Sequence, residues 1–319
     1  MPRSGPVNDT NIADLKVAIL LGTFNGQPHL SDQLDSFVTQ TLNNWSVWAS
    51  DDGSTDQTMD ILEKYQSTWG KSRLTIRRGP QQGFAANFLS LVCDPNIDAD
   101  YYAFSDQDDI WEADKLSAAL TRLEQIPKET PALYCGRTLL VDENNNKIGF
   151  SKTLCKPPCF SNALLQNIAG GNTMVFNKAA RDIMLATGKN LKIVSHDWWA
   201  YLLVSGCGGV VLYDPTPYIR YRQHARNFVG TNKGVSASLT RLHKIFHGRY
   251  REWLNTNLAA LASIKDRLTL ENKSTLESFS LARKKPLIIR TFAIFSSGVH
   301  RQTIFGNSGV FVASLLNKI

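Results

Sequence analysis

The sequence lacks any long apolar run. No uncharged hydrophobic stretch approaches the roughly 18 residues that a helix needs to cross a membrane. Residues 1–15 include Pro2, Pro6, Asn8 and Asp9, and they lack the apolar segment of a secretory signal peptide. These absences favour a cytoplasmic protein over a membrane-spanning or secreted one, and we expect residues 1–15 to form a flexible arm.

Cysteines are few, and their spacing is not that of a metal site. The chain has five, and only Cys155 and Cys159 lie close together. A structural zinc site would need a second close pair to complete its four ligands. We therefore interpret the cysteines as reduced thiols.

Two common nucleotide-binding motifs are also missing. Gly70-Lys71-Ser72 is similar to the end of a P-loop, but Tyr65 stands where that motif needs its first glycine. No Gly-x-Gly-x-x-Gly follows the first predicted strand, so the dinucleotide-binding fingerprint is absent. These absences exclude both motif-based assignments.

Charge is unevenly distributed along the chain. Residues 1–232 carry 21 Lys and Arg against 24 Asp and Glu, whereas residues 233–319 carry 14 against 4. The basic region also contains apolar stretches at 286–295 and 310–316. This combination favours an anionic membrane surface or an acidic partner over nucleic acid, because no nucleic-acid-binding module is recognisable. A basic, solvated helical region remains the alternative.

Strand and helix patterns alternate in the first third of the chain. Short apolar runs typical of buried strands occur at 16–23, 45–50, 74–77 and 101–104. Helical spacing of apolar residues fills the segments between them. The alternation predicts an α/β fold with a mostly parallel, Rossmann-like sheet flanked by helices. We expect one catalytic domain over 16–232 and a mainly helical C-terminal region over 233–319.

Two later segments predict further elements. Apolar residues at 133–141 and 147–150 flank Asp142-Glu143-Asn144-Asn145, which predicts a β-hairpin. Helical spacing at 113–123 predicts a helix directly after the fourth strand. Beyond the hairpin the pattern is mixed α and β.

An acidic cluster follows the fourth predicted strand. Asp106, Asp108 and Asp109 fall within four positions, directly after the apolar segment 101–104. Adjacent carboxylates repel one another, and a set of oxygen ligands favours Mg²⁺ or Mn²⁺ over Zn²⁺. The cluster therefore predicts a divalent metal site. The alternative is a turn in which Asp109 caps the next helix.

Two more polar clusters follow predicted strands. They span Thr23 to Gly26 and Ser50 to Ser54. Ligands of open α/β sheets bind beyond the carboxyl ends of the strands. We therefore expect the three clusters to line one crevice.

These motifs resemble those of the family 2 glycosyltransferases of the GT-A fold. The matching segments are Thr23-Phe24-Asn25-Gly26, Asp51-Asp52-Gly53-Ser54 and Asp106-Gln107-Asp108-Asp109-x-Trp111. Three further segments resemble the branch that contains bacterial rhamnosyltransferases: Gly170-Gly171-Asn172-Thr173, His196-Asp197-Trp198-Trp199 and Tyr221-Arg222-Gln223-His224. The resemblance covers residues 16 to about 230, and residues 235–319 match no motif.

The resemblance implies a nucleotide-sugar site with a metal. The residues that it places against the donor are Thr23, Asn25, Asp51, Asp52, Asp106, Asn172 and Arg222. Asp106-x-Asp108 resembles the family's DxD motif, with Asp106 near the ribose and Asp108 as the preferred metal ligand. His224 resembles a histidine that contacts the metal or the diphosphate. The implied cofactor is Mg²⁺ or Mn²⁺, which neutralises charge on the departing nucleoside diphosphate.

Asp197 is the expected general base. Inverting transfer needs one carboxylate to remove the proton of the acceptor hydroxyl as its oxygen attacks the anomeric carbon. Helical spacing over 195–205 places Asp197 in a first helical turn, where the helix dipole favours the ionised form. Its alternative role is that of a dipole partner alone. Asp109, Trp198 and Trp199 are expected acceptor or sugar contacts, with core packing as the alternative for the tryptophans.

Together these features imply an inverting, metal-dependent glycosyltransferase. The expected reaction moves L-rhamnose from dTDP-L-rhamnose onto a lipid-linked saccharide in surface-polysaccharide or O-antigen assembly, at the inner face of the cytoplasmic membrane. Transfer from a UDP-hexose or a UDP-N-acetylhexosamine is an alternative, because the same acids suit uracil and thymine. A non-catalytic nucleotide-binding scaffold is a further one. A nucleotidyltransferase is disfavoured because residues 23–26 lack a basic, glycine-rich loop.

Overall fold

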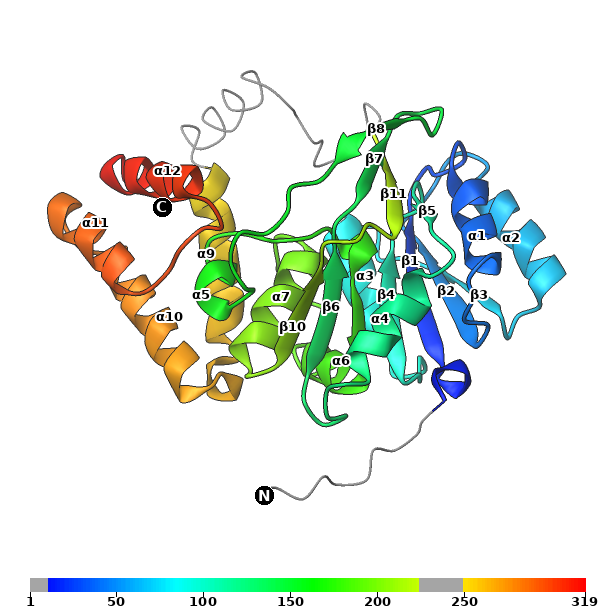
Figure 1. Cartoon of the computed structure of the whole chain (residues 1–319), viewed down its shortest axis with the longest axis horizontal. Helices are drawn as coiled ribbons and strands as arrows, with labels where there is room; N and C mark the ends of the chain where they lie inside the picture. Colours follow the sequence, from blue (N-terminus) through cyan, green and yellow to red (C-terminus); the bar gives the residue numbers. More distant parts are fainter. Residues whose placement is uncertain (1–10, 224–248) are drawn as a thin grey trace.

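The computed structural model describes residues 11–223 and 249–319. Most of the expected N-terminal arm, and the expected boundary at residues 232 and 233, lie outside these ranges. Within them, a seven-stranded sheet forms the centre of the molecule, with the order β10-β6-β9-β4-β1-β2-β3 (Figure 1). Neighbouring strands are parallel except at β9, which runs antiparallel to β4 and β6. The predicted α/β fold with a mostly parallel sheet is confirmed.

The strands and the flanking helices alternate as the sequence predicts. The strands of the sheet are β1 (Val17–Thr23), β2 (Trp45–Asp51), β3 (Leu74–Arg78), β4 (Tyr101–Ser105), β6 (Ala132–Gly136), β9 (Val175–Asn177) and β10 (Val210–Asp214). The helices beside them are α1 (Leu30–Val38), α2 (Thr58–Trp69), α3 (Phe84–Val92), α4 (Lys115–Leu123), α5 (Phe160–Ala163), α6 (Lys178–Leu185) and α7 (His196–Gly206). Both faces of the sheet are therefore covered.

Side chains of β1 show how the two faces are buried. Val17, Ile19 and Leu21 join a core formed with α1, α2 and α4, whereas Ala18 and Leu20 join a core formed with α3, α6 and α7. Alternate side chains of a strand point to opposite faces of the sheet. Because each face has its own core, β1 is apolar at every position from 17 to 21 rather than at every second one.

A smaller four-stranded sheet corrects one sequence expectation. Its order is β5-β11-β7-β8, with β5 (Ile110–Trp111), β7 (Leu139–Val141), β8 (Lys147–Phe150) and β11 (Ile219–Arg222). The predicted single strand at 133–141 is two strands, β6 in the large sheet and β7 in the small one, because the chain leaves the large sheet after Gly136. The hairpin of β7 and β8 is confirmed.

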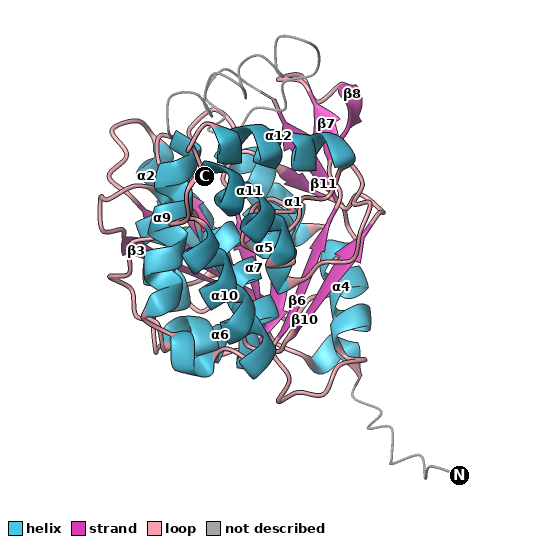
Figure 2. Ribbon diagram, turned by 90° about the vertical axis from the view of Figure 1, so that its left-hand side faces the viewer, coloured by secondary structure: helices cyan, strands magenta, loops and turns pink. Residues whose placement is uncertain are grey.

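The described part of the C-terminal region is helical and shares a core with the rest of the molecule. It contains α9 (Arg249–Ala262), α10 (Leu270–Ala282), α11 (Leu287–Ser296) and α12 (Ile304–Leu315). Leu261 and Phe279 belong to the same hydrophobic core as Phe160 and Trp198. Figure 2 shows these C-terminal helices in front of the central sheet, beside α5 and α7. None of the helices in the two described ranges is long and apolar enough to cross a bilayer.

Candidate active site

The three polar clusters meet at one edge of the large sheet, as the parallel register requires. Thr23 at the end of β1 pairs with Asp51 at the end of β2, and Leu21 pairs with Ser105 at the end of β4. The Thr23 hydroxyl donates a hydrogen bond of 3.0 Å to Oδ1 of Asp51. The loops that follow these strands therefore begin side by side.

Asp51 organises the loop that follows it. Its Oδ2 accepts hydrogen bonds from the amides of Gly53 (3.2 Å) and Ser54 (2.9 Å). Gly53 has a φ of +96°, which residues with a Cβ rarely adopt. The hydroxyl of Ser54 in turn accepts from the amide of Asn25 at 2.8 Å, and Oδ1 of Asn25 accepts from the amide of Thr55 at 2.8 Å. The loops after β1 and β2 are thus tied together.

Asp52 ties the same loop to the segment before α3. Its two carboxylate oxygens accept hydrogen bonds from the amides of Gln81 (2.6 Å) and Gly83 (2.8 Å). Gly83 is the residue directly before α3, so the carboxylate lies at the positive end of that helix. Asp51 and Asp52 are both largely buried. Their acceptor oxygens therefore hold backbone in place around the crevice.

Gln107 joins the acidic cluster to the loop after β1, a role that the sequence did not reveal. Its side-chain amide donates to the carbonyl of Phe24 (2.9 Å), and its carbonyl oxygen accepts from the amide of Phe24 (2.8 Å). A Cβ at Gly26 would collide with the same side chain. Gln107 thereby holds the acidic segment against the first strand-end loop. The one signal was its place inside the acidic motif.

The structure brings Asp197 to the acidic cluster. Burial, followed by the charges of Asp108 and Asp197, raises the pKa of Asp106 to about 8. The side chains of Asp106, Asp108 and Asp197 are half-buried, so they remain accessible to a ligand. Asp197 lies in the first turn of α7, as predicted, and its Oδ1 accepts from the amide of Trp198 at 2.7 Å. The predicted base and the predicted metal acids therefore share one site.

Asp109 and Asn172 occupy a buried contact beside this site. The Asn172 amide donates to Oδ2 of Asp109, and the Arg222 backbone amide donates to Oδ1 at 3.4 Å. Burial, followed by the charges of Asp108 and Asp106, holds the pKa of Asp109 well above its usual range. Neither side chain is open to a ligand, which differs from the expected contacts of Asp109 with the acceptor and Asn172 with the donor. Asp109 does not cap a helix either, because α4 begins only at Lys115.

Lys115 is a second polar group that the sequence did not reveal. Its Nζ lies 3.4 Å from the centroid of the Trp111 ring, and it has no hydrogen-bond partner in the described part of the chain. Burial lowers its pKa well below the usual range, and the nearby Asp109 opposes that shift.

Arg222 links three segments instead of facing the crevice. Its guanidinium donates to the backbone oxygens of Asp108 (3.2 Å) and Glu143 (2.7 Å) and to the carboxylate of Asp32 (2.8 Å). Its side chain is 4% exposed. This burial contradicts the expectation that the Arg222 guanidinium contacts the diphosphate. His224, the other expected contact in this segment, lies outside the described residues.

Trp198 and Trp199 belong to the core. Trp199 has no exposed surface, and the indole nitrogen of Trp198 donates to the carbonyl of Ala163 at 2.7 Å. Both side chains join the core that α7 shares with α3 and α9. The expected sugar contact is therefore wrong for both tryptophans, and the core-packing alternative holds.

His196 is buried directly beside the candidate base. Its ring stacks on Phe88 with 3.8 Å between centroids, and both ring nitrogens lack hydrogen-bond partners among the described residues. Burial lowers its pKa to about 4, so the ring is neutral near pH 7. A Cβ on Gly171 would collide with Nε2 of His196. Gly171 therefore allows the close approach of the 170–173 segment to the start of α7.

The described residues offer partial coordination for a metal ion. No group of three or more His, Cys, Asp or Glu side chains in the ranges 11–223 and 249–319 is arranged to hold one. Mg²⁺ in nucleotide sites is bound through one or two carboxylates, with phosphate oxygens and water as the other ligands. Asp106 and Asp108 suit that donor set, since a cation would also relieve the repulsion that raises the pKa of Asp106.

Comparison with known proteins gives concordant results. The model of the Glycosyl transferase family 2 matches residues 18–185. The dTDP-rhamnosyl transferase RfbG of Shigella flexneri is 30% identical over 255 residues, which cover 76% of this chain and 84% of that protein. A further curated relative, the glycosyltransferase RP339 of Rickettsia prowazekii, is 23% identical over 69% of this chain and 68% of its own.

Solved structures show the same fold. The S. aureus TarS 1–349 complex with UDP-GlcNAc aligns with a TM-score of 0.54 at 14% identity, over 94% of this chain and 82% of that one. The mannosyltransferase PcManGT from Pyrobaculum calidifontis, in complex with GDP-Man and Mn²⁺, aligns with a TM-score of 0.51 at 16% identity, over 95% and 87%. At such low identity the likeness shows the shared GT-A fold. From the family match, the RfbG similarity and the fold, this chain belongs to the family 2 glycosyltransferases.

Proposed function

We propose that the protein is an inverting, metal-dependent rhamnosyltransferase that uses dTDP-L-rhamnose. Membership of the family supports sugar transfer, and the similarity to the dTDP-rhamnosyl transferase RfbG supports this donor. The observation that carries the reaction class is the proximity of Asp197 to Asp106, which also interacts with Asp108. The proposed acceptor is a lipid-linked saccharide at the inner face of the cytoplasmic membrane, in surface-polysaccharide or O-antigen assembly.

The strand-end loops are the proposed donor site. Asn25 and Asp106 are half-buried and would contact the nucleoside, whereas Thr23, Asp51 and Asp52 hold the surrounding backbone in place. Such preorganisation reduces the entropy that is lost when a nucleotide binds. Asp106 and Asp108 would hold the metal, which when bound neutralises charge on the departing nucleoside diphosphate.

Asp197 is the proposed base. An acceptor hydroxyl oxygen forms a bond to the anomeric carbon as the bond from that carbon to the diphosphate oxygen breaks. The hydroxyl proton passes to the Asp197 carboxylate, and dTDP leaves with the electron pair of the broken bond. One displacement inverts the configuration, so no second nucleophilic carboxylate is required.

Replacing Asp197 with Asn tests the base directly. The variant should transfer sugar at least about 100-fold more slowly, because general-base catalysis contributes about 10²–10⁴-fold. Its binding of dTDP should be unchanged. Asp266→Asn is the matched control, since its carboxylate is 99% exposed on the C-terminal region. The measurement is mass-spectrometric detection of sugar transfer to membrane extract, and wild-type turnover in Asp197→Asn would refute the assignment.

A thermal-shift series separates the donor alternatives. With Mn²⁺ present, dTDP should raise the melting temperature more than UDP or GDP does. A larger shift with UDP, together with transfer from a UDP-hexose or UDP-N-acetylhexosamine, would favour the alternative donor. Nucleotide binding without transfer from any donor would favour the scaffold alternative.

A further inference from the structure

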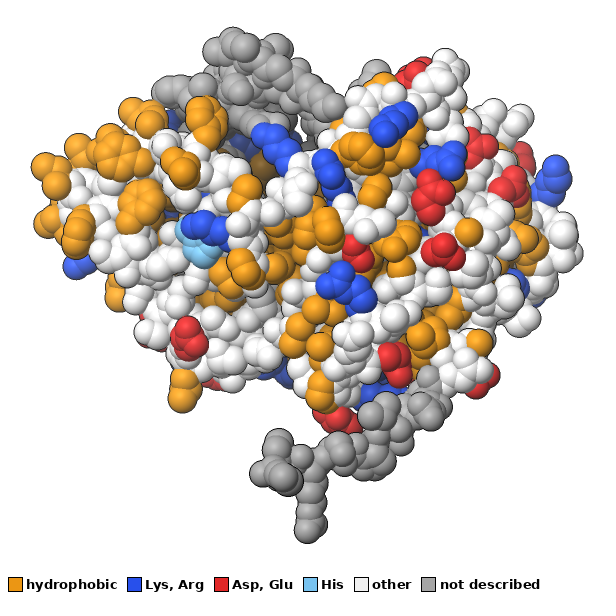
Figure 3. All heavy atoms as spheres, viewed as in Figure 1, with side chains coloured by type: hydrophobic (Ala, Val, Ile, Leu, Met, Phe, Trp, Pro, Cys, Tyr) orange, Lys and Arg blue, Asp and Glu red, His pale blue; other side chains and the backbone are white. Residues whose placement is uncertain are grey.

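The outward sides of α11 and α12 form an apolar surface that nothing in the described chain covers. Its members are Leu287, Ile288, Ile289, Phe292, Phe295, Ile304, Phe305, Phe311, Val312, Leu315 and Leu316. Figure 3 shows hydrophobic side chains gathered at the left end of the molecule, where Figure 1 places α11 and α12. We propose that this α11–α12 apolar face docks on an anionic lipid bilayer.

Helix α11 is oriented with its apolar side outward. Ile288 is 81% exposed and Phe292 is 77% exposed, whereas Arg290 and Thr291 face inward and are buried. A helix on the surface of a water-soluble protein normally buries its apolar side. The reversed arrangement is expected when the outer surroundings are themselves apolar.

Helix α12 repeats this arrangement. Ile304 is 88% exposed and Phe305 is 76% exposed, while the small residues Ala313 and Ser314 are buried. Small residues at the contact between two helices allow their backbones to approach closely. Each helix therefore places one large apolar residue, Ile294 or Val310, in the core together with small or polar residues, and exposes most of its other large apolar side chains.

Hydrogen bonds between the two helices hold this orientation. The Arg290 guanidinium donates to the carbonyl of Ser314 (3.1 Å) and to the side chain of Asn317 (2.9 Å). The hydroxyls of Thr291 and Ser314 lie 2.8 Å apart. Rotating α11 to hide its apolar side would leave these buried polar groups without partners, which is unfavourable.

The positive charge around the α11–α12 apolar face favours an anionic bilayer as its binding partner. Residues 278–319 contain no Asp or Glu, and their basic residues are Arg283, Lys284, Lys285, Arg290, Arg301 and Lys318. A bilayer with anionic lipids attracts basic residues that adjoin an apolar surface. A second copy of the chain would instead bring cations against cations with no acid between them, because a two-fold interface pairs the same surface with itself.

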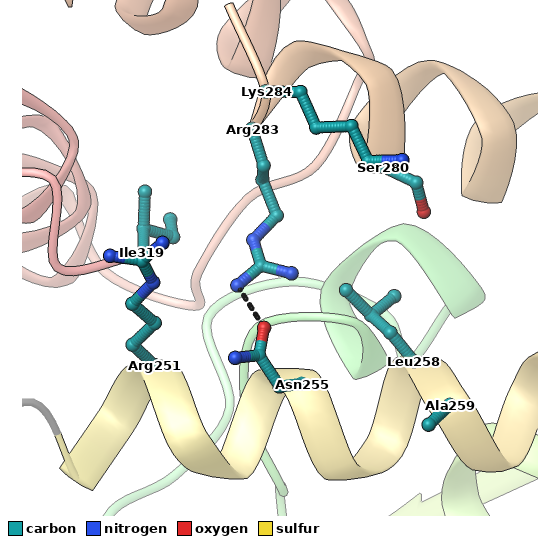
Figure 4. Close-up of a pocket in the computed structure, with 8 residues that line it drawn as sticks. All are labelled: Arg251, Asn255, Leu258, Ala259, Ser280, Arg283, Lys284 and Ile319. Carbon is teal, nitrogen blue, oxygen red and sulfur yellow. Dashed lines mark hydrogen bonds between the residues drawn. The ribbon is translucent and has the colours of Figure 1, made fainter.

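Basic groups also line a cavity of about 380 Å³ next to this face. Its lining includes Arg251, Arg283 and Lys284, which come from α9 and from the connection between α10 and α11 (Figure 4). Arg283 donates to the side chain of Asn255 at 2.7 Å, which fixes its guanidinium toward the cavity wall. These groups add positive potential beside the apolar residues.

The dimensions indicate docking on one leaflet. Helices α11 and α12 have 10 and 12 residues, so they are about 15 and 18 Å long, short of the roughly 30 Å hydrocarbon core. In Figure 1, α12 at the left end and the small β5-β11-β7-β8 sheet right of the centre both lie on the upper side of the molecule, toward which the parallel strands run. A bilayer there would bring a lipid-linked acceptor near the active site. That last step rests on the proposed function, whereas the docking itself does not.

Vesicle co-sedimentation of the full-length protein tests the docking without any sugar donor. Wild type should bind vesicles that contain phosphatidylglycerol more strongly than vesicles of phosphatidylcholine alone. Phe292→Ser with Phe305→Ser should weaken binding at least about tenfold, because each phenylalanine loses its burial in lipid. Leu270→Ser with Ile148→Ser is the matched control, since both side chains are exposed outside the face, and it should bind as wild type does. Lys284→Gln with Lys285→Gln should reduce binding to the anionic vesicles alone.

Two results would overturn the proposal. One is a wild-type protein that stays in the supernatant with anionic vesicles. The other is a dimer, detected by light scattering, that Phe292→Ser with Phe305→Ser dissociates while vesicle binding is unaffected. A normal thermal shift with nucleotide in each variant shows that it is folded. Vesicle binding without sugar transfer would support the docking and count only against the proposed reaction.

Discussion

At the scale of single residues, the carboxylates of the site differ in what surrounds them. Asp51 and Asp52 accept hydrogen bonds from backbone amides, which hold the loops in place. Asp106 instead lies in a partly buried position beside two other acids, Asp108 and Asp197. Asp51 and Asp52 therefore have their hydrogen-bond partners within the protein, whereas the acids of the cluster repel one another.

Replacing Asp106 with Asn should stabilise the metal-free protein at alkaline pH. The folded pKa of about 8 lies above the ordinary value of 3.8, so the folded state binds more protons in this interval and loses stability as the pH rises from 4 to 8. The variant should unfold with at least about 1 kcal/mol more free energy than wild type at pH 8, since one pKa unit corresponds to about 1.4 kcal/mol. Denaturant titration with a chelator, at pH 4 and pH 8, measures this.

With Mn²⁺ and dTDP added, wild type should have a higher free energy of unfolding at pH 8 than Asp106→Asn. The cation removes the repulsion in wild type, whereas Asp106→Asn loses a ligand. The exposed Asp266→Asn should follow wild type throughout. Equal pH dependence in wild type and Asp106→Asn would contradict the repulsion within the cluster.

The contribution of His196 to stability should change with pH in the opposite direction to that of Asp106. Its folded pKa of about 4 lies below the ordinary 6.5, so the unfolded state binds more protons between these values. This group therefore costs stability as the pH falls from 6.5 to 4, by up to about 3 kcal/mol. His196→Leu should lose less unfolding free energy than wild type over that interval. Parallel pH profiles for the two proteins would show that the ring is not buried in its neutral form.

At the scale of elements, chain periodicity located strands and helices better than it located their ends. Helix α4 was expected from residue 113 but begins at Lys115, because the chain first forms β5. The segment 133–141 divides at Gly136-Arg137-Thr138, which separates the apolar residues of β6 from those of β7. The point at which the chain passes from one sheet to the other depends on pairing with strands that are distant in sequence.

Packing between two such elements positions the candidate base. Gly171→Ala should displace the start of α7, because the added methyl group meets His196, the residue next to Asp197. We expect a decrease in kcat of about 10–100-fold with a smaller change in dTDP affinity, since small misplacements of catalytic groups are costly. Gly309→Ala is the control: its Cβ would meet no atom within 4 Å. Steady-state kinetics measure both, and a wild-type kcat in Gly171→Ala would contradict the positioning role.

At the scale of the whole molecule, the C-terminal helices belong to the same body as the sheet. Leu254, Leu261 and Phe279 share a core with Trp198 and Trp199. Their composition had indicated a basic, mainly helical region. The structure instead gives these helices one side toward the common core and, in α11 and α12, another toward the surroundings.

Removing residues 249–319 should therefore destabilise the remainder of the protein. The shortened chain would expose the core side of α7 to water, and we expect low soluble yield and no cooperative unfolding transition by calorimetry. Substitutions on the α11–α12 apolar face should leave the transition intact, because those side chains are already exposed. A shortened chain that unfolds cooperatively at the wild-type temperature would show that the two parts are independent.

The sequence alone predicted much of the site and the fold. Period and turn chemistry located β1, β2 and β4, and the motifs after them identified the family, because these signals are carried by neighbours along the chain. Asp197 was also predicted, and its place in a first helical turn is confirmed. The burial of Arg222, Trp198 and Trp199 was not predicted, because a motif specifies residue types and does not specify burial.

Tertiary structure decided which of these residues meet and which remain open. It placed Asp197 beside Asp106, buried Asp109 against Asn172, and left the ring nitrogens of His196 without partners among the described residues. It also turned the apolar sides of α11 and α12 outward, although their sequences fit a buried helix equally well. Local sequence determines how a segment folds, whereas burial and charge interaction depend on segments that only the folded chain brings together.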